Sequence, residues 1–198
     1  MQSIRNKMLN RIYGKGRGWV FTPKSFADFG DMNSVRMALT RLVKNGTIRR
    51  LATGLYDYPE THATLGILPA KPEQIAKAVA GSENLAIQPS GAYASNLLGL
   101  SEQVPAQVVF LTDGLNKKIK AGKQEIIFKK TTPKNLATSG RISGLVIHAL
   151  RHIGYIHIDE SIIKKIQKRL DDKEKGILKR DQRFAPDWVK KIIKRIIG

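Results

Sequence analysis

The chain has 198 residues, of which 35 are Lys or Arg and 16 are Asp or Glu, so its net charge at pH 7 is +19. A field of this sign favours a polyanionic partner, and nucleic acid is the commonest one. The absence of cysteine excludes disulfides, thiolate metal sites and cysteine nucleophiles. Because no segment resembles a signal peptide or has the apolar length of a membrane span, we expect a cytoplasmic protein without a membrane partner.

The positive charge lies at the two ends of the chain. Residues 1–62 carry a net charge of +7, residues 63–120 carry +1, and residues 121–198 carry +11. Between the first two segments, YPETHATLGILPAKPEQ brings three prolines and loses strong hydrophobic periodicity. We therefore predict two domains, spanning residues 1–62 and 63–198.

The first of these domains is predicted to begin with helices and end in a β-hairpin. Its expected elements, in order, are a helix at about 3–13, a short strand at 20–22, helices at 24–29 and 34–45, and two strands around 52–54.

The helix at 34–45 has one apolar and one cationic face. Asn33 and Ser34 are favoured N-cap residues, and Gly46 stands where a left-handed residue ends a helix. The spacing i, i+3, i+4, i+7, i+8 of a buried stripe is met by Val35, Ala38, Leu39, Leu42 and Val43. The opposite face carries Ser34, Arg36, Met37, Thr40, Arg41 and Lys44. Such a helix has the size to enter a DNA major groove.

The neighbouring segments decide between an ordinary solvated surface and a DNA-binding helix. KSFADFG predicts a short helix ending at Gly30, and TIRRLATGLYDY predicts a hairpin whose first strand carries two arginines. Helix, strand, helix, helix, hairpin is the order of a winged helix-turn-helix. Base contacts are therefore predicted for Ser34, Arg36, Met37 and Thr40. Contacts to the DNA backbone or minor groove are predicted for Arg41, Lys44, Arg49, Arg50 and Thr53.

The segment FTPKSFADFGDMNSVRMALTRLVKNGTIRRLATGLYDYP resembles the N-terminal winged helix of AbiEi-type antitoxins, from bacterial abortive-infection (type IV) toxin–antitoxin systems. SNLLGLSEQVPAQVVFLTDG and TSGRISGLVIHALRHIG in the second half are also similar to this family. The resemblance implies a repressor that binds inverted repeats in its own promoter as double-stranded DNA. It also implies a C-terminal domain that counters a nucleotidyltransferase-like toxin, and it leaves open whether the two proteins touch and whether a homodimer forms on DNA.

The second domain is predicted to be mixed. Helices are expected at about 72–80 and 91–98, followed by an antiparallel meander of VVFLT, a short basic strand and QEIIFKKT, and then by helices at about 140–152, 159–172 and 186–197. The fold class expected for the whole chain is α+β, with a winged helix-turn-helix followed by a small antiparallel sheet and C-terminal helices. The apolar stripe of the last helix favours docking onto this domain, with dimerisation or a membrane surface as alternatives.

Other functions receive weaker support. The charge also suits an RNA- or ribosome-binding protein. His148 and His152 have the i, i+4 spacing of metal ligands but lack a third partner, so packed histidines are favoured. Asp113 and Glu125 flank strands as in metal nucleases, yet Lys129 follows too late for that site. GKGRG lacks the end of a phosphate-binding loop and is expected to be a flexible basic connector. We expect no enzyme activity, catalytic residue, metal or cofactor.

Overall fold

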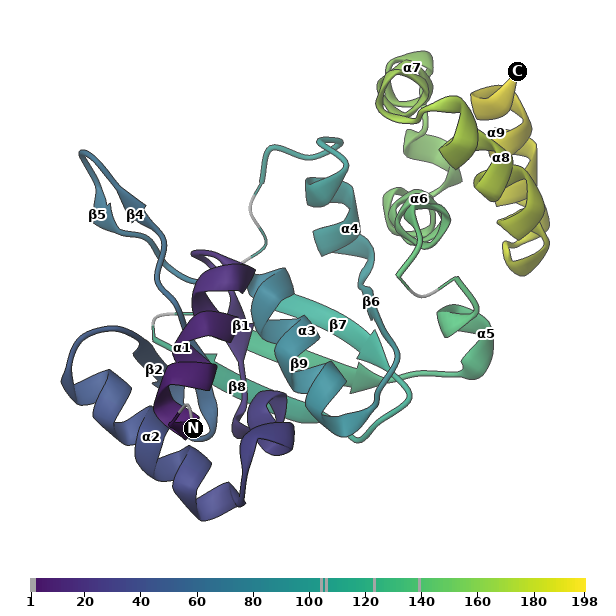
Figure 1. Cartoon of the computed structure of the whole chain (residues 1–198). Coiled ribbons are helices and arrows are strands. Elements are labelled where there is room, and N and C mark those ends of the chain that lie inside the picture. The colour runs from purple at the N-terminus through teal and green to yellow at the C-terminus, as the bar shows by residue number, and fades with distance from the viewer. Residues whose placement is uncertain (1–2, 104, 106, 123, 139) are drawn as a thin grey trace. The chain divides into compact units, whose positions relative to one another are not determined.

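The computed structural model describes residues 3–103, 105, 107–122, 124–138 and 140–198. It is an α+β protein with small antiparallel sheets, as the sequence predicts (Figure 1). The chain divides into two units, Met1–Leu85 with Ile119–Ile126, and Ala86–Lys118 with Ile127–Gly198. The predicted boundary between residues 62 and 63 lies inside the first unit, because helix α3 (Pro72–Glu83) packs against strand β1 (Val20–Phe21).

The first unit combines three α-helices with two small sheets. Its elements are α1 (Ile4–Lys15), β1 (Val20–Phe21), the 3-10 helix η1 (Pro23–Phe29), α2 (Met32–Lys44), β2 (Arg49–Ala52), β3 (Leu55–Asp57), β4 (Thr61–His62), β5 (Gly66–Ile67) and α3 (Pro72–Glu83). One antiparallel sheet has the order β1-β3-β2, and β4 pairs with β5 in a separate hairpin. The helices and strands predicted up to residue 57 are confirmed, whereas the β4–β5 hairpin was not predicted.

Helix α2 packs through the predicted apolar stripe. Val35, Leu39 and Leu42 have no exposed surface, and they join a core that α1, β1, η1 and β3 complete with Met8, Ile12, Phe21, Phe26 and Tyr56. Fully burying one such aliphatic side chain contributes about 1.5–3 kcal/mol. This burial fixes the rotation of α2 about its own axis, and therefore which residues face outward.

The N-terminus of α2 differs from the prediction. The helix begins at Met32 rather than after Asn33 or Ser34, because Asp31 is the N-cap. Its Oδ1 accepts hydrogen bonds from the backbone amides of Asn33 and Ser34, both at 2.9 Å. At the other end, Gly46 has the predicted left-handed conformation, with φ +68°.

The remaining elements contain a four-stranded sheet and most of the helices. They are β6 (Ile87–Pro89), α4 (Gly91–Leu97), β7 (Val108–Thr112), β8 (Lys117–Ala121), β9 (Gln124–Lys130), α5 (Pro133–Leu136), α6 (Ile142–Ile153), η2 (Tyr155–His157), α7 (Glu160–Arg169), α8 (Asp172–Asp181), η3 (Gln182–Phe184) and α9 (Asp187–Ile197). Helix α8 was not predicted, since its sequence, DKEKGILKRD, is mostly charged.

The predicted meander is wrong in its strand order, which is β6-β7-β9-β8. Strand β9 lies between β7 and β8, and β8 lies at the edge. The physical reason is in the side chains. Strand β9 buries Ile126, Ile127 and Phe128, whereas β8 exposes Lys117 and Lys118, and lysines suit an edge because they oppose pairing with another strand.

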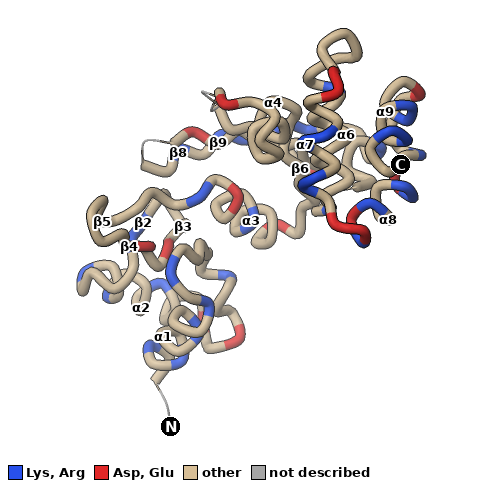
Figure 2. Tube along the Cα trace, turned by 90° about the horizontal axis from the view of Figure 1, so that it is seen from above, with Lys and Arg blue, Asp and Glu red and all other residues tan. Residues whose placement is uncertain are grey.

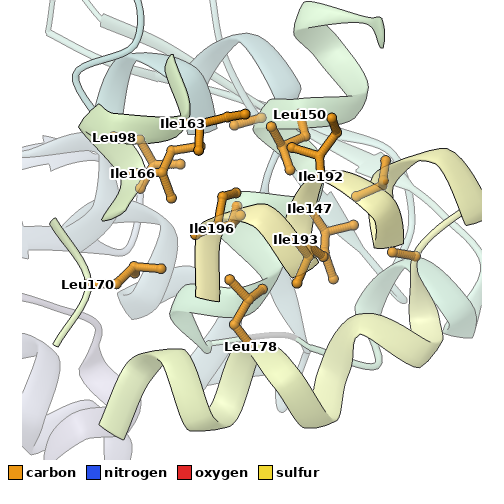
Figure 3. Packing of buried hydrophobic residues seen from close by; sticks show 14 of the residues in the cluster. Leu98, Ile147, Leu150, Ile163, Ile166, Leu170, Leu178, Ile192, Ile193 and Ile196 are labelled. Atoms are coloured by element: carbon orange, nitrogen blue, oxygen red, sulfur yellow. The ribbon is translucent and has the colours of Figure 1, made fainter. Parts of the chain in front are cut away.

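Helices α4, α6, α7, α8 and α9 enclose the core of the second unit (Figure 3). Residues Val189, Ile192, Ile193 and Ile196 of α9 are buried in it. The predicted docking of the terminal helix is therefore confirmed, and its apolar stripe is covered by the chain's own helices. Among the described residues, every helix is too short or too polar to cross a lipid bilayer.

His148 is a buried polar residue of α6. It is 6% exposed, and its Nε2 lies 3.0 Å from the backbone oxygen of Asn135, so the neutral ring donates a hydrogen bond there. Burial lowers the pKa of His148 below its ordinary value, and the nearby Arg151 charge acts in the same direction against the opposing effect of the Asn135 hydrogen bond. His148 is therefore packed and hydrogen-bonded, as favoured from the sequence, while His152 is exposed.

We predict that the unfolding free energy of the second unit falls as the pH drops below about 6.5, the ordinary histidine pKa of an unfolded chain. Below that pH, His148 is protonated in the unfolded chain but stays neutral in the folded one. The unfolding free energy therefore falls by up to about 1.4 kcal/mol per pH unit. Urea unfolding of the Trp19→Phe variant between pH 7.5 and 5, followed by Trp188 fluorescence, measures this slope. His148→Gln should flatten the slope and His152→Gln should not; equal slopes in all three proteins would contradict the prediction.

Candidate nucleic-acid interface

The outward face of α2 gathers most of the predicted contact residues. Exposed side chains on this face belong to Arg36, Met37, Thr40, Arg41 and Lys44, while Ser34 is half-buried near the N-terminus. Met37 is 56% exposed, which is unusual for a large apolar side chain on a helix that has a core to pack against. The face therefore combines cations, a hydroxyl and one thioether.

The charges of this face are not neutralised by α2 itself. The helix sequence, MNSVRMALTRLVK, contains no Asp or Glu, and Arg41 and Lys44 occupy its last turn. Within the described residues, no hydrogen bond or ion pair engages the side chains of Arg36, Arg41 or Lys44. These three cations are thus available to a ligand, and Figure 2 shows where Lys and Arg fall along α2.

Two hydrogen-bonded groups shape the helix locally. Hydrogen bonds from Ser34 hold the pKa of Asp31 below its ordinary value, so the capping carboxylate stays ionised to a lower pH than an ordinary aspartate. The Thr40 hydroxyl donates to the backbone oxygen of Arg36 at 2.9 Å, and its oxygen can still accept a hydrogen bond from a ligand.

The 3-10 helix η1 packs against α2 and is itself held by Arg11 of α1. Arg11 of α1 donates to both carboxylate oxygens of Asp28 in η1, at 2.8 and 2.7 Å, and to the backbone oxygen of Ser25 at 2.7 Å. Its guanidinium also lies 3.9 Å from the ring centre of Phe29. Because η1 packs against α2, this arginine helps to position the helix without belonging to its outer face.

The β2–β3 hairpin presents two further predicted residues. Arg50 on β2 is exposed, and its Nε donates to the backbone oxygen of Ala52 at 3.4 Å, a long bond. Thr53 is exposed in the turn, where Gly54 has φ +69°. The strand register is irregular between Arg50 and Ala52.

Arg49 has a different environment from the other predicted contacts. Its Nε and Nη2 donate to the two carboxylate oxygens of Asp57 at 3.0 and 2.6 Å, and Nη2 also donates to the backbone oxygen of Leu68 at 3.1 Å. Asp57 is only 1% exposed, so this arginine neutralises a buried carboxylate. The structure thus gives Arg49 a role in holding the hairpin, a role that the sequence interpretation missed.

Asp113 is one of the two carboxylates considered for nuclease chemistry. Asp113 accepts a hydrogen bond from the Ala86 amide at 3.0 Å. In the part of the chain that the structure describes, no group of three or more His, Cys, Asp or Glu side chains could hold a metal ion.

The GKGRG segment is held at its C-terminal end rather than free. The Gly18 amide donates to the Tyr58 oxygen at 2.7 Å, and Arg17 donates to the Pro59 oxygen at 2.9 Å. The guanidinium of Arg17 also lies 4.8 Å from the centre of the Tyr58 ring. Its expected role as a flexible connector is therefore corrected, because these bonds fix it beside the end of β3.

A family model matches most of the chain. The model is described as a family of unknown function (DUF6088), and it matches residues 7–178. The chain belongs to the DUF6088 family. No curated protein matches it. The crystal structure of the RV2827C protein from Mycobacterium tuberculosis is similar with a TM-score of 0.47 and 11% sequence identity, covering 100% of this chain and 77% of that chain.

A second basic surface of this DUF6088 protein follows its C-terminal helices (Figure 2). Several of its cations are balanced locally, since Lys190 pairs with Asp187, Lys175 with Asp172 and Arg195 with Glu160. Others, such as Lys173 and Lys179, are exposed with no partner among the described residues.

We predict that the adjacent residues Arg49 and Arg50 differ in their effect on stability. Arg49→Ala leaves the Asp57 carboxylate buried without its partner, and should lower the unfolding free energy by about 2–3 kcal/mol. This loss is smaller than that for a fully buried ion pair, because Arg49 is partly exposed to solvent. Arg50→Ala should change it by less than about 0.5 kcal/mol. Urea unfolding of the Trp188→Phe protein, followed by Trp19 fluorescence, measures both changes, and equal losses would refute the assignment.

Proposed function

We propose that this protein is a sequence-specific, double-stranded DNA-binding transcriptional repressor. The observation that carries the proposal is the outer face of α2, where Arg36, Arg41 and Lys44 have no internal partner among the described residues and stand beside an exposed Met37. A helix of 13 residues is about 20 Å long and fits the major groove. Cations with no acid to neutralise them favour phosphate as their ligand.

We further propose that the first unit is a winged helix-turn-helix. This is supported by the element order α1, β1, η1, α2, β2, β3 and by the antiparallel order β1-β3-β2. In this arrangement α2 is the recognition helix and the β2–β3 turn is the tip of the wing. The exposed positions of Arg50 and Thr53 suit contact with the DNA backbone or minor groove.

The proposed contacts divide along α2. Ser34, Arg36 and Met37 are assigned to base edges because the N-terminal residues of a recognition helix reach furthest into the groove, and Thr40 extends this set. Arg41 and Lys44 in the last turn, with Arg50 and Thr53 on the hairpin, are assigned to the backbone. Arg49 is left out of the phosphate-binding set, because Asp57 already occupies its guanidinium.

The biological role that we propose is that of an antitoxin regulating its own operon. Its support is the resemblance of residues 21–59 to AbiEi-type antitoxins, so the expected partner is a nucleotidyltransferase-like toxin. Co-expression tests this role. If the gene beside this one encodes such a protein, its toxicity should disappear when this chain is present and persist when it is absent. Toxicity that is equal in both cases would exclude the antitoxin role without affecting DNA binding.

We predict that Arg36→Ala reduces discrimination between operator and random DNA. A bidentate contact from arginine to guanine contributes about 1–3 kcal/mol of base discrimination. The measurement compares binding to a duplex carrying the inverted repeats of the protein's own promoter with binding to a scrambled duplex. Equal weakening on both duplexes would contradict a base contact.

We predict that Lys44→Ala and Arg50→Ala weaken binding to both duplexes alike. Each variant should lower the slope of log K against log salt by about one unit, since one phosphate contact is lost. The slope is measured by fluorescence anisotropy at roughly 50–300 mM KCl, because counterion release changes the DNA affinity strongly over such salt concentrations. Lys173→Ala on α8 is the charge-matched control and should keep the parent slope.

The main rival is an RNA- or ribosome-binding function, which the net charge of +19 also suits. Competition at physiological salt separates the two proposals. Promoter duplex should displace labelled promoter duplex at lower concentration than double- or single-stranded RNA of equal length. Preferred displacement by RNA would overturn the DNA assignment.

A further inference from the structure

The first unit contains a cavity that the proposed DNA contacts do not use. It has a volume of about 390 Å³, within the range typical of small-molecule sites. The lining residues that bear on a ligand are Trp19, Lys24, Gln74, Lys77, Gly81 and Ser82. The whole lining comes from β1, η1 and α3 and the segments beside them, and all of it belongs to one unit.

The lining of this cavity is positively charged. It contains two lysines and, among the described lining residues, no carboxylate. The Nζ of Lys24 donates to the Ser82 backbone oxygen at 2.9 Å, which leaves two of its three donors for a ligand. Lys77 is exposed, with no side-chain partner in the described part of the chain. The cavity therefore favours an anion.

The same cavity has an aromatic wall. Trp19 is half-buried, and its ring lies 4.6 Å from that of Phe21 and 5.9 Å from that of Phe26, measured between centroids. These neighbours hold the indole in position, and an indole offers a large flat contact area to a planar ligand. The side-chain amide of Gln74 has no hydrogen-bond partner among the described residues, and it adds both a donor and acceptors for a heterocycle.

On its α3 side the cavity is lined by small residues beside Gln74 and Lys77. Ala78, Gly81 and Ser82 line it, and a Cβ built at Gly81 meets no atom within 4 Å. Glycine in a helix costs about 1 kcal/mol relative to alanine. Neither a positive φ nor a close neighbour requires glycine at position 81, and this part of the lining has room for a larger side chain.

We propose that this cavity binds a small organic anion with a planar base, of the nucleoside monophosphate class, with the phosphate on Lys24 and Lys77 and the base against Trp19. Charge, an aromatic wall and volume agree on this class. A purely apolar ligand would leave the ammonium groups without a counter-charge, and inorganic phosphate alone would leave the wall and most of the volume unused. The site does not depend on the DNA-binding proposal.

The test uses Trp19 as its own reporter. The chain has two tryptophans, so Trp188→Phe makes Trp19 the sole one in the full-length protein. This protein is titrated separately with AMP, GMP, CMP and UMP, and with adenosine and inorganic phosphate. At least one monophosphate should change the fluorescence saturably. Its affinity should be at least about ten-fold higher than that of adenosine or inorganic phosphate, a difference of about 1.4 kcal/mol in binding free energy. No saturable change with any of the four monophosphates would overturn the proposal.

Matched variants in the same background locate the site. Lys24→Ala with Lys77→Ala should weaken the monophosphate at least about ten-fold, whereas Lys173→Ala should not. Gly81→Leu places a side chain in the cavity and should abolish binding, while the smaller Gly81→Ala retains it. Both Gly81 variants improve helix propensity, so their circular dichroism melts should match or exceed the parent. Undiminished binding by Gly81→Leu would show that the ligand lies elsewhere and would refute the site.

Discussion

The first unit depends on the burial of one stripe of α2. Val35, Leu39 and Leu42 are fully covered, and at about 1.5–3 kcal/mol each they contribute roughly 4.5–9 kcal/mol together. A helix is rigid about its axis, so burying one stripe decides which residues stand on the other side. The availability of Arg36 and Lys44 to a nucleic acid follows from this packing.

The hairpin beside α2 follows a second constraint, a shift in strand register. If β2 and β3 paired regularly from Ala52 and Leu55 onward, without a bulge, Arg50 would lie opposite Asp57. The irregularity between Arg50 and Ala52 shifts the pairing by one residue, so that Arg49 faces Asp57 instead. Because neighbouring residues on a strand point to opposite faces, this shift assigns one arginine to the buried carboxylate and the other to solvent.

The second unit separates its charge and its apolar surface in the same way. Helix α9 buries Val189, Ile193 and Ile196 against other helices, and its lysines remain on the outer side. The covered apolar face of this amphipathic helix contributes to the stability of its own unit, and the same packing leaves its cations on the outside. The cavity in the first unit differs, because polar and charged side chains of α3, Gln74 and Lys77, share its lining with small residues.

The sequence by itself determined the positions of most helices and of the β2–β3 hairpin, and the outward residues of α2 and α9. These are local properties, since a helical period of 3.6 places residues on faces without reference to the rest of the chain. Tertiary structure decided what depends on distant partners. Strand β9 lies between β7 and β8, Arg49 also bonds the backbone oxygen of Leu68, and a cavity opens between β1, η1 and α3. Strand order, register and cavities arise from the packing of segments far apart in sequence, which no local pattern encodes.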